Sequence, residues 1–77
     1  MQRLRLLPCR GVAFIAEAAD FRHRRRRGKH RLHRANDGRA VIIPDHRRQV
    51  IVAALLCKVI RDLGLTVDEY NQMADTL

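Results

Sequence analysis

Apolar residues at helical spacing mark two helices in this chain. The first falls between residues 8 and 19, where apolar side chains recur three and four positions apart: Val12, Ile15, Ala16 and Ala19. Pro8 suits the first turn of this helix, because its missing N–H would have no partner there. The second falls between residues 52 and 63 and carries one continuous stripe that we expect in the core: Val52, Leu55, Leu56, Val59, Ile60 and Leu63.

Signals for a helix end and a new helix start follow this stripe directly. Gly64 stands where a left-handed residue commonly ends a helix. Thr66 and Glu69 have the spacing of a capping box, in which each residue satisfies the backbone N–H of the other. The sequence therefore predicts a short third helix that brings three of its side chains onto the core: Val67, Tyr70 and Met73.

The segment between the two main helices has the pattern of strands. Residues 36–38, Asn-Asp-Gly, are a hairpin-turn signal between residues 31–34 and the β-branched run 41–43. The sequence predicts a preceding strand over residues 21–26, and residues 27–29 would turn the chain into the next one. Together these segments predict a three-stranded antiparallel meander.

The order of the elements predicts the fold class. A helix, three strands, a helix and a short C-terminal helix form an α+β two-layer fold, with both main helices on one sheet face and the other face wet and basic. A chain of 77 residues has room for one small domain, which we take to cover residues 1–77.

The distribution of charge along the chain indicates the kind of partner it binds. The formal net charge is +8, and residues 22–48 alone hold eleven Lys and Arg against two Asp. Arginine predominates, and its planar group suits bidentate contact with phosphate, so nucleic acid is the expected partner. The three aromatic residues are too few for a base-stacking platform. The helix predicted over residues 52–63 has only two basic residues, Lys58 and Arg61, which disfavours helix-turn-helix recognition of DNA.

Other classes of protein are disfavoured by length and spacing. The longest uncharged apolar stretches, residues 11–16 and 50–57, fall far short of the roughly 18 residues of a membrane span. We expect a cytoplasmic protein with no membrane partner. Cys9 and Cys57 lie far apart without a Cys-x-x-Cys pair, so we expect two reduced, partly buried thiols and no disulfide framework. Neither falls at ligand spacing with a histidine, and we expect no metal or cofactor.

The chain resembles the HicA-type toxins, a family of small mRNA interferases, in collinear order over residues 8–71. The matching pieces are Phe21, residues 27–30 (Arg-Gly-Lys-His), residues 37–39 (Asp-Gly-Arg), residues 41–44 (Val-Ile-Ile-Pro) with His46, and residues 59–70. The resemblance implies a fold like a double-stranded-RNA-binding domain, helix-strand-strand-strand-helix. It also implies an endoribonuclease toxin of a type II toxin–antitoxin system, with a HicB-like antitoxin protein as its partner.

The family's Gly-Ser-His motif carries its catalytic histidine, which maps onto His30. Three segments depart from the family pattern. Lys29 replaces a small residue, His33 stands where an aromatic or large apolar residue is usual, and residues 52–55 lack the usual Pro and Gly at the helix start. The last departure predicts that the second helix begins at least one turn earlier than in the family. A non-catalytic RNA-binding domain and a decayed, inactive toxin remain as alternatives.

His30 offers a chemical route to RNA cleavage without a metal. Such cleavage needs a base for the 2′-hydroxyl, an acid for the 5′-oxygen and positive charge at the phosphate, and imidazole serves as base or acid near neutral pH. His46, after the last strand, is the reserve acid or base. Gly28 would form the motif turn, and the expected RNA-binding residues surround it: Arg24, Arg26, Arg27, Lys29 and Arg31.

Two further expectations concern side-chain directions. Strict alternation in a strand would place Arg24 and Arg26 on one face and Arg25 and Arg27 on the other. His23 and His33 are expected at the surface or at the edge of the core.

Overall fold

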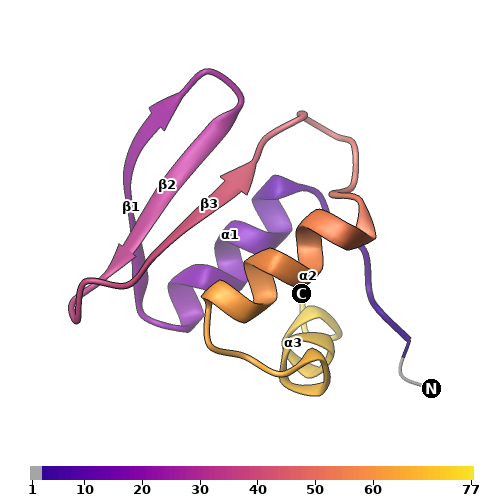
Figure 1. The fold of residues 1–77 in the computed structure, drawn as a ribbon. Helices are drawn as coiled ribbons and strands as arrows, with labels where there is room; N and C mark the ends of the chain where they lie inside the picture. The colour runs from indigo at the N-terminus through magenta and orange to yellow at the C-terminus, as the bar shows by residue number, and fades with distance from the viewer. Residues whose placement is uncertain (1–2) are drawn as a thin grey trace.

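A computed structural model describes residues 3–77, so the predicted domain of residues 1–77 is covered except for its first two residues. Three helices and three strands follow in the order α1, β1, β2, β3, α2, α3 (Figure 1). Their bounds are α1 Cys9–Ala18, β1 Phe21–Arg27, β2 His30–Ala35, β3 Ala40–Pro44, α2 Ala53–Asp62 and α3 Val67–Ala74. The predicted α+β order of elements is confirmed.

The three strands form one antiparallel sheet in the order β1-β2-β3, which confirms the predicted meander. Arg27 pairs with His30 across the first turn, and His30 pairs with Pro44 of β3 at the same end of the sheet. Gly28 in that first turn has φ 57°, a left-handed conformation that glycine adopts at little cost. The turn therefore brings the chain directly from β1 into His30.

The core lies between one face of the sheet and the helices, which gather on one side of the sheet in Figure 1. We call this face the inner face and the opposite one the outer face. Residues of the inner face alternate along the strands and are buried: Phe21, His33, Ala35, Val41 and Ile43. Helix α1 packs against β1 and β3, and α2 packs against β3. Within residues 3–77, no helix covers the outer face, although one flank of α2 borders it.

The predicted stripe of α2 is only partly in the core. Leu56, Val59, Ile60 and Leu63 are buried, but Val52 is 59% exposed and Leu55 is 45% exposed. The prediction was wrong for these two residues. The helix begins at Ala53, so Val52 is an extended N-cap residue, and Leu55 lies on the flank of α2 that borders the outer face of the sheet.

The predicted third helix and its caps are confirmed. The Glu69 N–H donates to the Thr66 hydroxyl at 3.0 Å, and the Thr66 N–H donates to the Glu69 carboxylate at 2.8 Å. Gly64, which precedes them, has a left-handed φ of 78°. Tyr70 is fully buried and Met73 packs against the core, whereas Val67 stays outside the core cluster.

Hydrogen bonds and an ion pair connect the segment before α1 to α3 and its C-cap, at the opposite end of the sequence. The Tyr70 hydroxyl donates to the carbonyl of Arg5 at 2.6 Å, and the N–H of Arg5 donates to the Asn71 side chain at 3.0 Å. The guanidinium of Arg5 also pairs with Asp75 at 2.9 Å. These contacts close the helical layer around the core.

Two more expectations about side chains need correction. His33 is 1% exposed and belongs to the inner face, because it alternates in phase with Ala35; it does not lie at the surface or at the edge of the core. Cys9 is buried, but Cys57 in α2 is exposed, so only one of the two thiols is protected. His23 is exposed as expected.

The helices are short and amphipathic. Within residues 3–77, no helix has both the length and the apolar character needed to cross a membrane.

Candidate nucleic-acid interface

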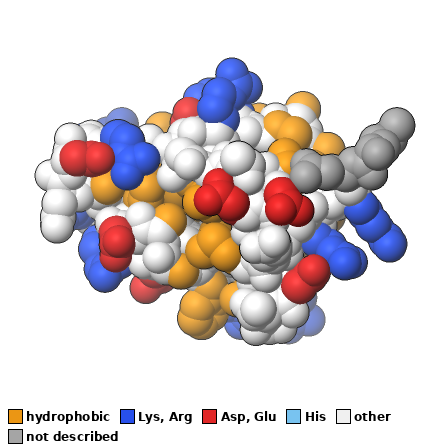
Figure 2. Space-filling model, turned by 90° about the horizontal axis from the view of Figure 1, so that it is seen from below, with side chains coloured by type: hydrophobic (Ala, Val, Ile, Leu, Met, Phe, Trp, Pro, Cys, Tyr) orange, Lys and Arg blue, Asp and Glu red, His pale blue; other side chains and the backbone are white. Residues whose placement is uncertain are grey.

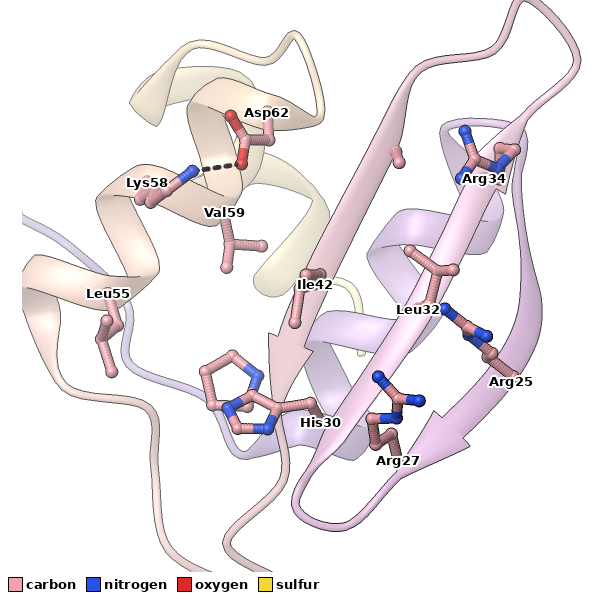
Figure 3. A pocket seen from close by; sticks show the side chains of 12 residues that line it. Arg25, Arg27, His30, Leu32, Arg34, Ile42, Leu55, Lys58, Val59 and Asp62 are labelled. Carbon is pink, nitrogen blue, oxygen red and sulfur yellow. Dashed lines mark hydrogen bonds and ion pairs between the residues drawn. The ribbon is translucent and has the colours of Figure 1, made fainter.

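The outer face of the sheet and one flank of α2 enclose a groove of about 750 Å³ (Figure 3). This volume lies within the roughly 300–1,000 Å³ typical of ligand sites. Successive side chains of a strand point to opposite faces of the sheet, so each strand contributes every second side chain to the groove. We refer to this site as the outer groove.

Basic residues line the outer groove around an apolar floor. The basic residues are Arg25, Arg27, Arg34 and Lys58, and the apolar ones include Leu32, Ile42 and Leu55. In Figure 3, the side chains of Leu55 and Val59 lie across the groove from those of Leu32 and Ile42. The site can hold an anionic chain by its phosphates and accommodate the less polar surface of a sugar or base.

His30 lies in this outer groove, at the first position of β2. Its imidazole points from β2 toward the side formed by α2 (Figure 3), and the residue is exposed. Arg27 is its cross-strand partner and lines the same groove. Among residues 3–77, no side chain or backbone group forms a hydrogen bond with the His30 imidazole. Its nitrogens are therefore open to a ligand.

One carboxylate, Asp62, also lines the outer groove. It accepts a hydrogen bond from Lys58 Nζ at 2.9 Å, one helical turn away on the same flank of α2. In the structure this pair directs the ammonium group along the flank of α2, a contact of a class worth about 0.2–0.5 kcal/mol.

His46 is exposed in the loop after β3 and does not line the outer groove. The loop begins at the end of the sheet where His30 lies, since the Asp45 N–H donates to the Lys29 carbonyl at 2.7 Å. His46 thus follows a residue that is bonded to the His30 turn, but its side chain is outside the groove that holds His30.

The arginines predicted to bind RNA are divided between the two faces. Arg27 lines the outer groove together with Arg25, whereas Arg26 lies on the inner side. A β-bulge between His23 and Arg25 leaves Arg24 without a cross-strand partner, so strict alternation stops at that residue.

Lys29 and Arg31 occupy different places beside His30. Lys29 is exposed in the turn between β1 and β2, while the side chain of Arg31 points away from the outer groove. Arg31 Nε donates to Asp45 Oδ2 at 3.0 Å. Of the five residues expected to bind RNA, only Arg27 lines the groove with His30.

Asp45 is a buried carboxylate that the sequence interpretation did not single out. It is 6% exposed and is surrounded by the guanidinium groups of Arg31 and Arg26 and the N–H of Arg47. Burial by itself would raise the pKa of Asp45, but the hydrogen bond from Arg47 and the charge of Arg31 hold it below its usual value. Asp45 is therefore ionised at neutral pH and anchors the loop that carries His46.

The outer face and the helical end of the molecule differ in charge. Figure 2 views the molecule from below, the side of α3 in Figure 1, and shows acidic and apolar side chains near its centre, with Lys and Arg mostly toward its margin. The first turn of α3 carries two acids, Asp68 and Glu69. Among residues 3–77, no group of three His, Cys, Asp or Glu side chains comes together to hold a metal ion.

The sequence interpretation missed several members of the outer groove: Arg25, Arg34, Lys58, Leu32, Ile42 and Leu55. Alternation from His30 would have found Leu32 and Arg34, since they share its face of β2. The contribution of α2 had no local signal, because it depends on how the helix lies beside β3.

Comparison of the sequence with models of known protein families finds no match, and comparison with curated proteins finds none either.

Proposed function

We propose that this chain is an endoribonuclease toxin of a type II toxin–antitoxin system, with a fold like a double-stranded-RNA-binding domain. It binds mRNA in the outer groove and cleaves it in the cytoplasm without a metal, with His30 as general acid or base. One observation carries this proposal: an exposed imidazole with free nitrogens lies in a groove that also holds Arg25, Arg27 and Lys58.

The chemistry required is a transfer of the phosphoryl group between two oxygens of the RNA. The 2′-oxygen attacks phosphorus and loses its proton, while the bond to the 5′-oxygen breaks and that oxygen gains a proton. His30 can perform one of these transfers, and water can complete the other. Arg25 and Arg27 lie where their charge would stabilise the phosphate as negative charge builds on its oxygens.

The decisive experiment compares wild type with His30→Ala, with His46→Ala as the matched exposed histidine outside the groove. We expect His30→Ala to lower the rate of RNA cleavage by about 10²–10⁴-fold, with little change in RNA affinity or melting temperature. His46→Ala should cleave like wild type. Equal cleavage by wild type and His30→Ala would falsify the catalytic role of His30.

A non-catalytic RNA-binding domain is the second candidate function. It is favoured by the lack of any described side chain that orients the His30 imidazole, since a catalytic histidine commonly has a hydrogen-bonded partner. Under this function wild type binds RNA in the same groove, but neither wild type nor His30→Ala cleaves it. The same pair of proteins thus separates the two functions.

The toxin assignment implies a HicB-like antitoxin as a partner. Opposite charge would speed its capture of the basic groove, so an acidic protein is the expected chemistry. Expression of the chain alone should arrest growth, and co-expression of the product of a neighbouring reading frame should restore growth and give a stoichiometric complex. If growth continues without any partner, the toxin assignment fails even where RNA binding persists.

A further inference from the structure

A second basic hollow lies on the inner side of the sheet, beyond the covered part of the core. Five arginines line it with Asp45 and Pro8, and we call it the arginine hollow: Arg10, Arg26, Arg31, Arg47 and Arg48. They come from α1, β1, β2 and the loop after β3. Residues far apart in the sequence therefore converge on one site.

Asp45 holds the floor of the arginine hollow in place. Its Oδ2 accepts from Arg31 Nε at 3.0 Å and lies 3.4 Å from a terminal nitrogen of Arg26, while its Oδ1 accepts from the Arg47 N–H at 3.1 Å. Arg47 has a left-handed φ of 60°, unusual for a residue with a side chain. Asp45 thus links the loop that carries Arg47 and Arg48 to β1 and β2.

Positive charge in the arginine hollow exceeds what Asp45 can balance. Within residues 3–77, the side chains of Arg10, Arg47 and Arg48 make no ion pair, and all three are exposed. Asp45 is the single carboxylate among the lining residues. Guanidinium groups that line one hollow repel one another, and an anion with several oxygens would relieve that repulsion. A phosphate has this chemistry.

The arginine hollow and the outer groove meet at one end of the sheet. His30 and Arg31 are consecutive in β2 and point to opposite faces, and so do Arg27 and Arg26 in β1. The end of β3 lies at this same end of the sheet, because the Asp45 N–H donates to the carbonyl of Lys29 in the turn before His30. A single strand of RNA that crosses this edge would contact both sites.

We propose that the arginine hollow binds a backbone phosphate of the same RNA strand whose scissile bond lies at His30. This inference rests on the proposed RNA cleavage and adds to it a second anchoring point away from the reacting phosphate. Arg10, Arg47 and Arg48 contact the phosphate, and Asp45 positions Arg26 and Arg31 beside it. The enzyme would then favour a strand that turns around the edge of the sheet.

The test uses a double variant, Arg47→Ala with Arg48→Ala, and a control with the same loss of charge, Arg3→Ala with Arg61→Ala, at exposed residues outside both sites. The probe is a 2′-O-methyl RNA of about 12 nucleotides, which cannot be cleaved. We expect the hollow variant to bind about tenfold more weakly at physiological salt, with a salt slope smaller by about 0.7, the value for one phosphate of a single strand. The control should change neither quantity as much.

A set of probes with one uncharged methylphosphonate linkage at each position in turn locates the phosphate. In wild type, two linkages should weaken binding when neutralised, and the hollow variant should lose sensitivity at only one of them. Equal sensitivity in wild type and the hollow variant at every linkage would overturn the arginine hollow while leaving the outer groove in place. Absence of RNA binding by wild type would overturn both sites.

Discussion

His23 and His33 are cross-strand partners whose rings meet edge to face, with centroids 5.2 Å apart and an interplanar angle of 72°. They differ sharply in environment, because His23 is exposed while His33 is 1% exposed. Nδ1 of His33 is buried without a hydrogen-bond partner among the described residues. Burial first, and then the charge of His23, lowers the pKa of His33 below its usual value of 6.5. The core therefore contains a neutral imidazole that is not fully satisfied.

The first prediction is that His33→Leu stabilises the protein. Leucine has a similar volume and no polar atom to leave unpaired, so the free energy of unfolding should rise by about 1 kcal/mol. Urea unfolding at pH 7 measures the change, and the exposed His46→Gln is the control. A loss of stability in His33→Leu would mean that the imidazole makes a favourable contact that outweighs its unpaired nitrogen.

The same histidine predicts how wild-type stability depends on pH. Because the pKa of His33 is lowered in the folded state, the unfolded chain takes up a proton first as the pH falls below 6.5. The contribution of neutral His33 is therefore complete above pH 6.5 and is lost as the pH falls toward the folded pKa. Unfolding curves between pH 7 and pH 5 should show this loss in wild type and less of it in His33→Leu. Parallel pH profiles would contradict it.

Asp45→Asn should destabilise the loop after β3. The amide keeps the shape of the carboxylate but loses its charge-assisted hydrogen bond from Arg31, of a class with a net contribution of about 1.5–3 kcal/mol, and its ion pair with Arg26. We expect a lower free energy of unfolding at pH 7, measured by urea titration. The pKa of Asp45 is lowered in the folded state, so its contribution is present above the unfolded value of 3.8 and vanishes as the pH falls through the folded pKa. Wild type and Asp45→Asn should therefore converge in acid.

Tyr70→Phe tests the link between the N-terminal segment and α3. The Tyr70 hydroxyl donates to the carbonyl of Arg5, and burial raises the pKa of Tyr70 to about 12. Phenylalanine keeps the packing but leaves that carbonyl unpaired, at a cost of about 1–2 kcal/mol. Hydrogen exchange should show faster exchange at residues 5–7 in the variant, with α2 unchanged at matched stability. Unaltered exchange would show that the bond to Asn71 is enough to hold the segment.

The elements of the fold were predictable because their signals are local. The capping box of Thr66 and Glu69 and the hairpin turn at residues 36–38 are each set by neighbours a few positions apart, and both appear where expected. The burial of His33 follows from alternation along β2, since His33 lies two residues before the buried Ala35. The residue type was misleading, because histidine is polar and was expected at the surface or at the edge of the core. The exposure of Val52 follows from a helix start that apolar periodicity does not define.

The candidate site was less predictable because it is made by pairing and by tertiary placement. His30 and Arg27 were identified from the motif, and the structure places both in the outer groove. Arg25 shares that groove while Arg26 turns to Asp45, and the bulge after His23 sets this division. Leu55 and Lys58 join only because α2 lies beside β3. No spacing along the chain encodes that contact.

The final prediction separates phosphate binding from chemistry in the outer groove. Replacing both Arg25 and Arg27 by Ala removes two exposed cations that line the groove with His30 and leaves Lys58 paired with Asp62. The salt slope of RNA binding should become smaller by about 0.7–1.4, because each lost phosphate contact no longer releases counter-ions. His30→Ala should keep the wild-type slope and lose cleavage. Fluorescence anisotropy across a salt series, together with cleavage of the same RNA, measures both quantities. If the double variant keeps the wild-type slope, the RNA backbone does not pass through this groove, and the arginine hollow becomes the main phosphate site.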